Sequence, residues 1–408
     1  MSTKVMMYSH DTYGLGHLRR NLAIATALIE TIPEVQVLLA TGSSIVEKLH
    51  RAQRIQLVQL PPVVKVGVDE YRAVEKGMSL SLVRRARSAI LIDVVSRWHP
   101  DLLLVDHSPQ GMKGELLPVF SHIKENGLNT QIVLGLRDIV DNPEYVRTLW
   151  EKDGVYETLE EVYDEVLIYG SKAIFDVIAN YGIDNKLANK YTYCGYVTNP
   201  PNGDSTDIPT TPIGPYLLGT IGGGGDGTEV LKGTLEAAKL LHLGAVIVTG
   251  PFMNQRDRRL LDDLLPAYPG AIAVELTNGL GTLAKNAVCV ICRGGYNTLA
   301  ELLYLKVPIV AVPRRWPRAE QVMRVEAFSA LGLLQNIASG EDMEISELVS
   351  AIKHAISAAK NPTTTIDLEG NVQAVQRINS LITKKVATSE IDSPKRTVLH
   401  AEEQCQIG

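Results

Sequence analysis

A histidine that follows two glycines near the N-terminus is the first candidate for chemistry. Gly14 and Gly16 precede His17, and all three come after an apolar segment, residues 5–9, that predicts a strand. Glycines at this point let the chain turn tightly into a helix and leave room for a ligand. An imidazole has an unperturbed pKa of about 6.5, which suits a general base. We therefore predict that His17 is catalytic, with helix capping or packing as the alternative.

Acidic and basic residues follow two further apolar segments of this half. Asp106 ends the run Leu102–Val105, and Arg137 and Asp138 follow another such run. The carboxyl ends of parallel strands meet at one edge of a sheet, so these side chains should face the same cleft as His17. We predict that Asp106 orients His17 as the acid of a His–Asp pair, or else caps the next turn. Arg137 and Asp138 are predicted acceptor-cleft residues, as ligand contacts or as a salt bridge.

The second half carries two glycine-containing strand ends. Four consecutive glycines follow one apolar run, and Arg293 precedes a glycine pair after another. Backbone N–H groups at such helix starts suit a diphosphate, and no Gly-Lys-Ser/Thr follows, which excludes a P-loop. A purely structural glycine loop is the alternative. Glu301, two turns into its helix, can accept hydrogen bonds from ribose hydroxyls, as carboxylates do in dinucleotide sites. The predicted donor-site residues are Gly222, Gly223, Gly224, Gly225, Arg293, Gly294, Gly295, Asn297, Thr298, Glu301, Glu320 and Gln321.

Short apolar segments alternate with helical stretches in both halves of the chain, which predicts an α/β protein with two doubly wound, Rossmann-like domains facing a central cleft. The proline-rich stretch after residue 197 predicts a linker. The expected units are a first domain at 1–197, a linker at 198–215, a second domain at 216–365, a last helix at 366–384 and a disordered tail at 385–408.

The composition excludes several classes of protein. The 408 residues include 45% hydrophobic residues and a net charge of -6, which gives no global attraction to nucleic acid. Four cysteines are too few for a disulfide scaffold, and Cys289 and Cys292 lie in an apolar strand, where residues three apart face opposite ways. We expect core cysteines, no metal and no cofactor. No apolar run reaches the roughly 20 residues that span a bilayer, and we expect a cytoplasmic protein.

Taken in order, these motifs resemble those of the GT-B glycosyltransferases. The His17 turn, the glycine loop and the segment from Arg293 to Gln321 carry the resemblance, which covers about residues 5–335. The similar groups are the bacterial peptidoglycan N-acetylglucosaminyl transferase, the diacylglycerol glycosyltransferases, and the plant and antibiotic glycosyltransferases. Blocks 8–20, 100–111 and 135–138 resemble a bacterial group known mainly as predicted glycosyltransferases.

The resemblance implies an inverting, metal-independent transfer from a nucleotide-sugar donor, with uridine favoured, to a small-molecule or lipid acceptor. It also implies that Glu301 binds the ribose and that Glu320 and Gln321 contact the donor sugar. By the same resemblance the first domain, 1–197, binds the acceptor, the second, 216–365, binds the nucleotide-sugar donor, and the helix at 366–384 packs back on the first domain. The plant pattern has His-Cys-Gly-Trp where this chain has Cys292-Arg293-Gly294-Gly295, so Arg293 is expected to contribute the phosphate contact.

Two other functions remain as alternatives: a nucleotide-sugar hydrolase with a similar Gly-x-Gly-His turn, and a non-catalytic sugar-nucleotide-binding protein. Peripheral membrane contact is a further option. It would use the apolar residues between Leu60 and Val64 and the arginines Arg84, Arg85, Arg87 and Arg97, and an ordinary loop beside a solvated helix face is its alternative.

Overall fold

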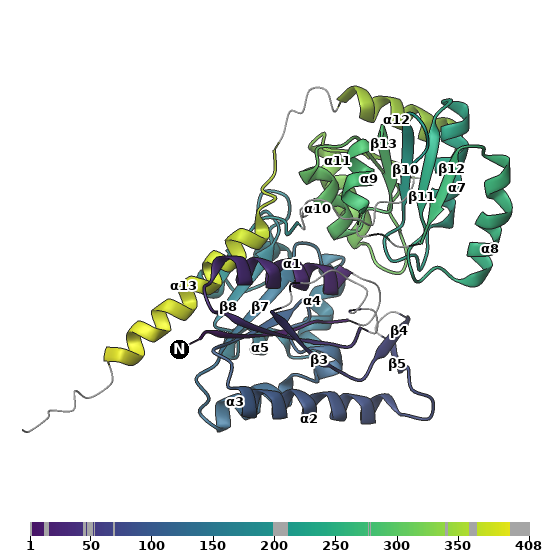
Figure 1. Cartoon of the computed structure of the whole chain (residues 1–408). Coiled ribbons are helices and arrows are strands. Elements are labelled where there is room, and N and C mark those ends of the chain that lie inside the picture. The colour runs from purple at the N-terminus through teal and green to yellow at the C-terminus, as the bar shows by residue number, and fades with distance from the viewer. Residues whose placement is uncertain are drawn as a thin grey trace, which may run out of the picture.

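Two parallel β-sheets, each flanked by helices, make up the computed structural model of the chain (Figure 1). The structure describes residues 2–11, 16–43, 46, 52, 54–67, 70–198, 211–275, 277, 279–338, 342–358 and 365–391, without the side chains of residues 65 and 385–391.

The first sheet has seven parallel strands in the order β3-β2-β1-β6-β7-β8-β9. Its strands are β1 (Lys4–Tyr8), β2 (Gln36–Thr41), β3 (Ile55–Gln59), β6 (Leu102–Asp106), β7 (Gln131–Arg137), β8 (Glu165–Tyr169) and β9 (Tyr191–Tyr193). The helices are α1 (Gly16–Thr31), α2 (Leu80–Trp98), α3 (Leu117–Glu125), α4 (Pro143–Lys152), α5 (Val155–Glu161) and α6 (Val177–Asn180), with short 3-10 helices η2 (Met112–Gly114) and η3 (Asn185–Lys190). An antiparallel hairpin, β4 (Val63–Gly67) and β5 (Glu70–Ala73), precedes α2.

Alternate residues of these strands enter different hydrophobic clusters. Val5 and Met7 of β1 pack in the cluster that includes α1, whereas Met6 and Tyr8 pack with α2 and α3. A strand covered on both faces must be apolar throughout, which explains the nearly uninterrupted apolar sequences of β1 and β6.

The second sheet has six parallel strands in the order β12-β11-β10-β13-β14-β15. Its strands are β10 (Tyr216–Thr220), β11 (Gly244–Val248), β12 (Ala271–Val274), β13 (Cys289–Cys292), β14 (Ile309–Ala311) and β15 (Gln335–Asn336). Its helices are α7 (Thr228–Leu240), α8 (Gln255–Leu264), α9 (Leu280–Asn286), α10 (Tyr296–Tyr304), α11 (Glu320–Ala330) and α12 (Ile345–Ala358), with the short 3-10 helix η4 (Leu265–Ala267).

Each sheet reverses its strand order at one place, and the candidate motifs lie there. In the first sheet β1 lies between β2 and β6, and in the second β10 lies between β11 and β13. Connections leave the two central strands on opposite sides, so a crevice opens at their carboxyl ends, where ligands bind in such sheets. His17 follows β1, the glycine loop follows β10, and Arg293 follows β13.

The last helix returns to the first domain. Helix α13 (Gly370–Ile391) packs against α1, and Arg377 holds the buried carboxylate of Glu165 through two contacts of 2.6 Å. The expected disorder from residue 385 is wrong at its start, because α13 continues to Ile391. Residues 392–408, and residues 199–210 of the expected linker, lie outside the described residues.

The segment expected to touch a membrane is partly buried. Leu60 and Val63 are buried, and buried Arg87 forms a bidentate ion pair with Glu115 at 2.7 and 2.8 Å. Tyr8 donates a further hydrogen bond to Glu115, which closes this polar core. Leu60, Val63 and Arg87 are therefore not part of the predicted surface, whereas the other three predicted arginines, Arg84, Arg85 and Arg97, are exposed.

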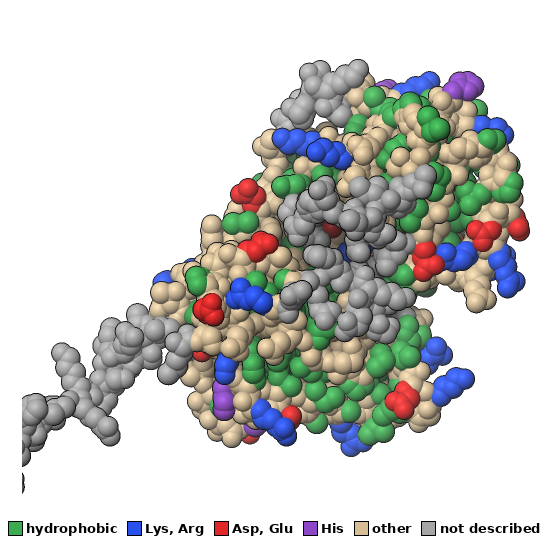
Figure 2. Space-filling view, in the orientation of Figure 1, with side chains coloured by type: hydrophobic (Ala, Val, Ile, Leu, Met, Phe, Trp, Pro, Cys, Tyr) green, Lys and Arg blue, Asp and Glu red, His purple; other side chains and the backbone are tan. Residues whose placement is uncertain are grey.

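Other apolar and basic side chains do reach the surface of this domain. Val66, Val74 and Leu82 are exposed, and Figure 2 shows hydrophobic side chains with scattered Lys and Arg on the N-terminal domain. Within the described residues, no helix combines the length and apolarity that crossing a membrane requires.

Candidate functional site between the domains

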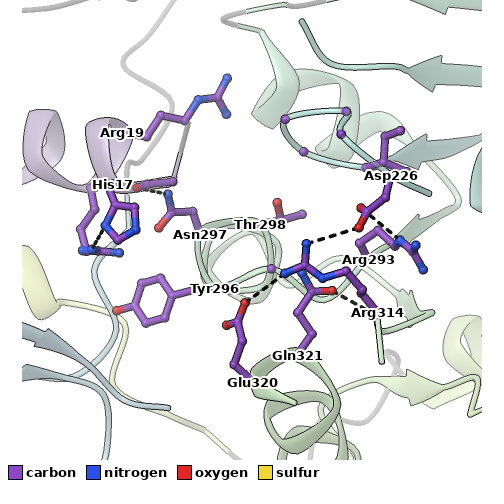
Figure 3. Close-up of a pocket in the computed structure, with 18 of the residues that line it drawn as sticks. His17, Arg19, Asp226, Arg293, Tyr296, Asn297, Thr298, Arg314, Glu320 and Gln321 are labelled. Atoms are coloured by element: carbon purple, nitrogen blue, oxygen red, sulfur yellow. Dashed lines mark hydrogen bonds and ion pairs between the residues drawn. The ribbon is translucent and has the colours of Figure 1, made fainter. Parts of the chain in front are cut away.

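A cavity of about 210 Å³ lies between the two domains, lined by residues of both. Figure 3 shows α1 on one side of it and α10, α11 and the glycine loop on the other. A hydrogen bond from Asn297 Nδ2 to the Gly16 carbonyl (2.8 Å) joins the starts of α1 and α10 across this cleft. The lining residues are Gly16, His17, Arg19, Arg20, Arg137, Ile221, Gly222, Gly223, Gly224, Gly225, Asp226, Arg293, Gly295, Tyr296, Asn297, Thr298, Arg314, Glu320 and Gln321.

On the first domain, His17 is paired with a buried carboxylate. Its Nδ1 lies 2.6 Å from Asp106 Oδ2, and Arg20 donates to Asp106 Oδ1 at 2.5 Å. Burial by itself would raise the pKa of Asp106, but the charges of Arg20 and His17 lower it well below its ordinary value. The ionised carboxylate only accepts hydrogen bonds, so it selects the tautomer of His17 with its proton on Nδ1. The lone pair is then on Nε2, as a base requires.

Two further histidines surround this pair. The ring centroid of His107 lies 5.0 Å from that of His17, and His10 lies 5.6 Å from His17. Burial, and then the charge of Arg137, lowers the pKa of His107 well below its ordinary value, so its ring is neutral. His107 has a φ of 62°, an unusual conformation for a residue with a side chain, and its N–H donates to the Gly135 carbonyl. The ring of His107 therefore adds no charge beside His17.

On the second domain, glycines bring Arg293 against the loop after β10. Gly227 has a φ of 104°, and a Cβ there would lie 2.8 Å from Arg293 Nε. A side chain at this position would thus be strained and would push Arg293 away. Helix α10 begins directly after Gly295, which lines the cavity, and α7 begins two residues after Asp226, which also lines it. No side chain of the described residues caps either helix start, so the first N–H groups of both helices are available to an anion.

Two arginines of the cavity share one carboxylate. Arg314 Nη1 lies 3.3 Å from Asp226 Oδ2, and Arg293 Nε lies 3.7 Å from Asp226 Oδ1 (Figure 3). Arg293 Nη2 also lies 2.9 Å from Glu229, in the first turn of α7. Arg293 is 7% exposed, so its permanent charge depends on these anions or on a bound one.

A buried ion-pair network joins the domains beside the cavity. Arg324 of α11 donates to Asp138 Oδ1 at 2.9 Å and to Glu320 Oε2 at 3.0 Å, and neither Arg324 nor Asp138 is exposed. Arg137 lies 3.5 Å from the same Glu320 oxygen. Burial alone would raise the pKa of Glu320, but Arg137, Arg324 and Arg314 lower it to about 2. The network fixes the loop after β7 to the start of α11.

The sequence of this chain is similar to those of known glycosyltransferases. Residues 236–380 match the glycosyltransferase family 28 C-terminal domain. A UDP-N-acetylglucosamine–N-acetylmuramyl-(pentapeptide) pyrophosphoryl-undecaprenol N-acetylglucosamine transferase from Corynebacterium efficiens is 24% identical over 228 residues, which are 48% of this chain and 62% of that protein. The match thus spans about three fifths of the relative's length.

Solved structures share the fold over nearly the whole chain. The glycotransferase of kitacinnamycin has a TM-score of 0.63 at 14% identity, with 94% of this chain and 99% of that chain covered. MurG of Acinetobacter baumannii has a TM-score of 0.55 at 15% identity, with 94% and 100% covered. The chain has the GT-B fold of these structures. At such identities the structures establish the fold, and the substrates remain to be proposed.

Most residues predicted for the GT-B site meet at the cavity. His17, Gly16 and Arg137 line it from the first domain. From the second domain it is lined by Gly222, Gly223, Gly224, Gly225, Arg293, Gly295, Asn297, Thr298, Glu320 and Gln321. Asp106 and Asp138 lie behind this surface, bound to His17 and Arg324, and Gly294 packs against Val325. Gly14 lies outside the described residues.

Glu301 does not line the cavity. It is half-buried on α10, three and four residues after Thr298 and Asn297, so it shares their face of the helix. Burial raises the pKa of its carboxyl, and the charge of Arg19 acts against that rise.

Several charged residues that line the cavity were not predicted from the sequence. Arg19 and Arg20 lie one turn along from His17, Arg314 follows β14, and Asp226 ends the glycine run. The rule that identified the other candidates, position at the carboxyl end of a strand, applies equally to Arg314 and Asp226.

The cysteines and the acidic residues do not form a metal site in the described part of the chain, where no group of three or more His, Cys, Asp or Glu side chains could hold an ion. Cys289 and Cys292 are both buried and belong to different hydrophobic clusters on the two faces of the second sheet, as the spacing predicts.

Proposed function

We propose that this chain is an inverting glycosyltransferase that moves a sugar from a nucleoside diphosphate donor to an acceptor hydroxyl. The observation that carries the proposal is the convergence of a His–Asp pair from one domain and two helix N-termini with Arg293 from the other on one cavity. The name of the Corynebacterium relative makes a UDP-sugar the first donor to test and a lipid-linked acceptor the first acceptor class. A small-molecule acceptor is the other class.

In this mechanism, His17 Nε2 takes the proton from the acceptor hydroxyl as the oxygen attacks the anomeric carbon. Asp106 then stabilises the imidazolium through its 2.6 Å contact with Nδ1. Arg20 keeps Asp106 ionised, so the carboxylate does not compete for the proton. A single displacement inverts the configuration at the anomeric carbon.

The departing nucleoside diphosphate gains negative charge, which positive groups of the second domain can stabilise. The N-termini of α7 and α10 and the guanidinium of Arg293 supply fixed positive charge at the cavity. We propose that these groups make a metal ion unnecessary. In the same scheme Glu301 binds the ribose, and Glu320 and Gln321 bind the donor sugar.

The proposal is tested first by binding. A panel of nucleoside diphosphates and their sugars should raise the melting temperature of the protein, by an amount set by affinity and concentration, and Arg293→Ala should abolish the effect. Exposed Arg97→Ala is the matched control, since that residue pairs with Asp93 on the surface of α2, outside the cavity. A well-folded protein that no member of the panel stabilises would contradict the donor site.

Turnover then separates the reactions that this fold supports. The donor that binds is incubated with lipid-linked and small-molecule hydroxyl acceptors, and the glycosylated product is measured by mass spectrometry. Donor consumption that is equally fast without any acceptor would identify a hydrolase. Tight binding without consumption would indicate a non-catalytic binding protein.

A further inference from the structure

We propose that Asp226 competes with the diphosphate of the donor for Arg293 and Arg314. This competition weakens donor binding and promotes release of the nucleoside diphosphate product. The inference rests on the proposed function and adds to it a residue that sets donor affinity. The carboxylate and a diphosphate need the same two guanidinium groups, so they compete for them.

The contacts of Asp226 explain why it is the competitor. Its two carboxylate oxygens lie near different arginines: Oδ2 is 3.3 Å from Arg314 and Oδ1 is 3.7 Å from Arg293. All three side chains line the cavity, between the glycine loop and the loop after β14 (Figure 3). A phosphate anion at the starts of α7 and α10 would lie beside this carboxylate, and like charges in contact repel.

The arginines are only partly satisfied by protein groups. The Nε atoms of Arg293 and Arg314 are buried, and neither has a hydrogen-bond partner among the described residues. Buried guanidinium N–H groups without an acceptor are costly, so this site favours an anion with more acceptor oxygens than one carboxylate offers. A diphosphate has that chemistry.

Asp226 can leave without moving the loop. The glycine loop is anchored by its backbone: the Phe252 N–H donates to the Gly223 carbonyl at 2.9 Å, and a Cβ on Gly224 would meet the Thr249 carbonyl. The side chain of Asp226, in contrast, is 41% exposed. Rotation of that side chain toward solvent is therefore enough to free both arginines.

Glu229 differs from Asp226 in this respect. It contacts Arg293 from the first turn of α7, and its side chain is 24% exposed, against 41% for Asp226. It can keep part of the charge of Arg293 balanced while Asp226 exchanges with the ligand. Return of Asp226 to both arginines after the reaction would displace the nucleoside diphosphate product.

Calorimetric titration of the full chain with inorganic pyrophosphate and with UDP tests this inference. Asp226→Asn keeps the shape and removes the charge, and it should bind both probes roughly five- to tenfold more tightly than wild type, the scale of one partly exposed ion pair. Exposed Asp262→Asn on α8 makes the same change in net charge and should bind as wild type does. The gain of Asp226→Asn should shrink as salt increases.

The outcomes separate the inference from the proposed function. If the probes bind wild type, and Asp226→Asn binds them equally or more weakly, Asp226 is not a competitor and the donor site stands. If Asp262→Asn gains as much affinity as Asp226→Asn, the effect is one of net charge and the inference fails. If neither probe binds any folded variant, as judged by circular dichroism, the donor site and the inference both fail.

Discussion

Replacing Arg324 by Met should destabilise the protein strongly, because it breaks the buried bridge between the domains. The guanidinium contacts Asp138 at 2.9 Å and Glu320 at 3.0 Å, and Asp138 and Arg324 have no exposed surface. The two carboxylates hold the pKa of Arg324 well above its ordinary value, although burial by itself would lower it. Removing one partner of such a pair leaves a buried charge and costs about 3–5 kcal/mol. For domains of this size the melting temperature should fall by roughly 6–20 °C.

Urea unfolding followed by circular dichroism measures this loss, and a double-mutant cycle assigns it. Met keeps the length and helix propensity of Arg324, so α11 itself should persist. The pair Arg324→Met with Asp138→Asn removes both charges and should recover part of the stability, with a coupling energy of about 0.5–3 kcal/mol. Arg97→Met is the control, since that arginine pairs with Asp93 at the surface, 80% exposed, and contributes little.

The bridge also bears on the shape of the molecule. Asp138 belongs to the first domain and Arg324 to the second, so its loss should let the cleft open, which small-angle scattering would record as a larger radius of gyration. Unfolding of Arg324→Met within about 1 kcal/mol of wild type would refute the reasoning. So would a double variant no more stable than the single one.

Other expected outcomes follow from the same site. With an active donor and acceptor pair, His17→Ala should lower kcat by about 10²–10⁴-fold, and Asp106→Asn should lower kcat while donor binding in titration is preserved. Nucleotide affinity should decline as pH falls through the raised pKa of Glu301, and Arg19→Gln should move that decline to higher pH, whereas a pH-independent Kd would exclude Glu301 from binding. The folded-state pKa of Glu320 is about 2, below its usual 4.5, so the stability that this carboxylate contributes is present above pH 4.5 and is lost as the pH falls toward 2. Thermal unfolding of Glu320→Gln, measured over the same pH range, should lack that loss.

Much of the fold could be predicted from the sequence because buried strands and helices place their apolar residues at clearly different spacings. Apolar runs such as residues 102–105 and 289–292 are too short for helices and too apolar for exposed strands, which predicts buried parallel strands. The candidate catalytic and binding residues could be predicted by a related rule: polar side chains in the segments that follow such strands lie at one edge of a sheet. His17 and Arg293 could therefore be assigned to clefts before any contact was known.

Surface and interior could not be separated by composition in the segment expected to touch a membrane. Arg87 is a basic residue of α2, and its residue type does not distinguish it from the exposed Arg84 one turn earlier. The buried charge of Arg87 is stabilised by its ion pair with Glu115, which lies 28 residues away in the sequence. A buried ion pair depends on both partners, and the sequence order does not bring them together.

The sequence by itself determined the two sheets, the cysteines of the core and the residue types that follow the critical strands. The tertiary structure alone decided which of these residues share a cavity, because the strand order reverses at β1 and at β10 and the domains face each other across those points. It also decided the charge balance: Asp226 with Arg314, and Asp138 with Arg324, are pairs separated by 88 and 186 residues. Electrostatic energy depends on distance in space and on burial, and neither quantity is encoded in local sequence pattern.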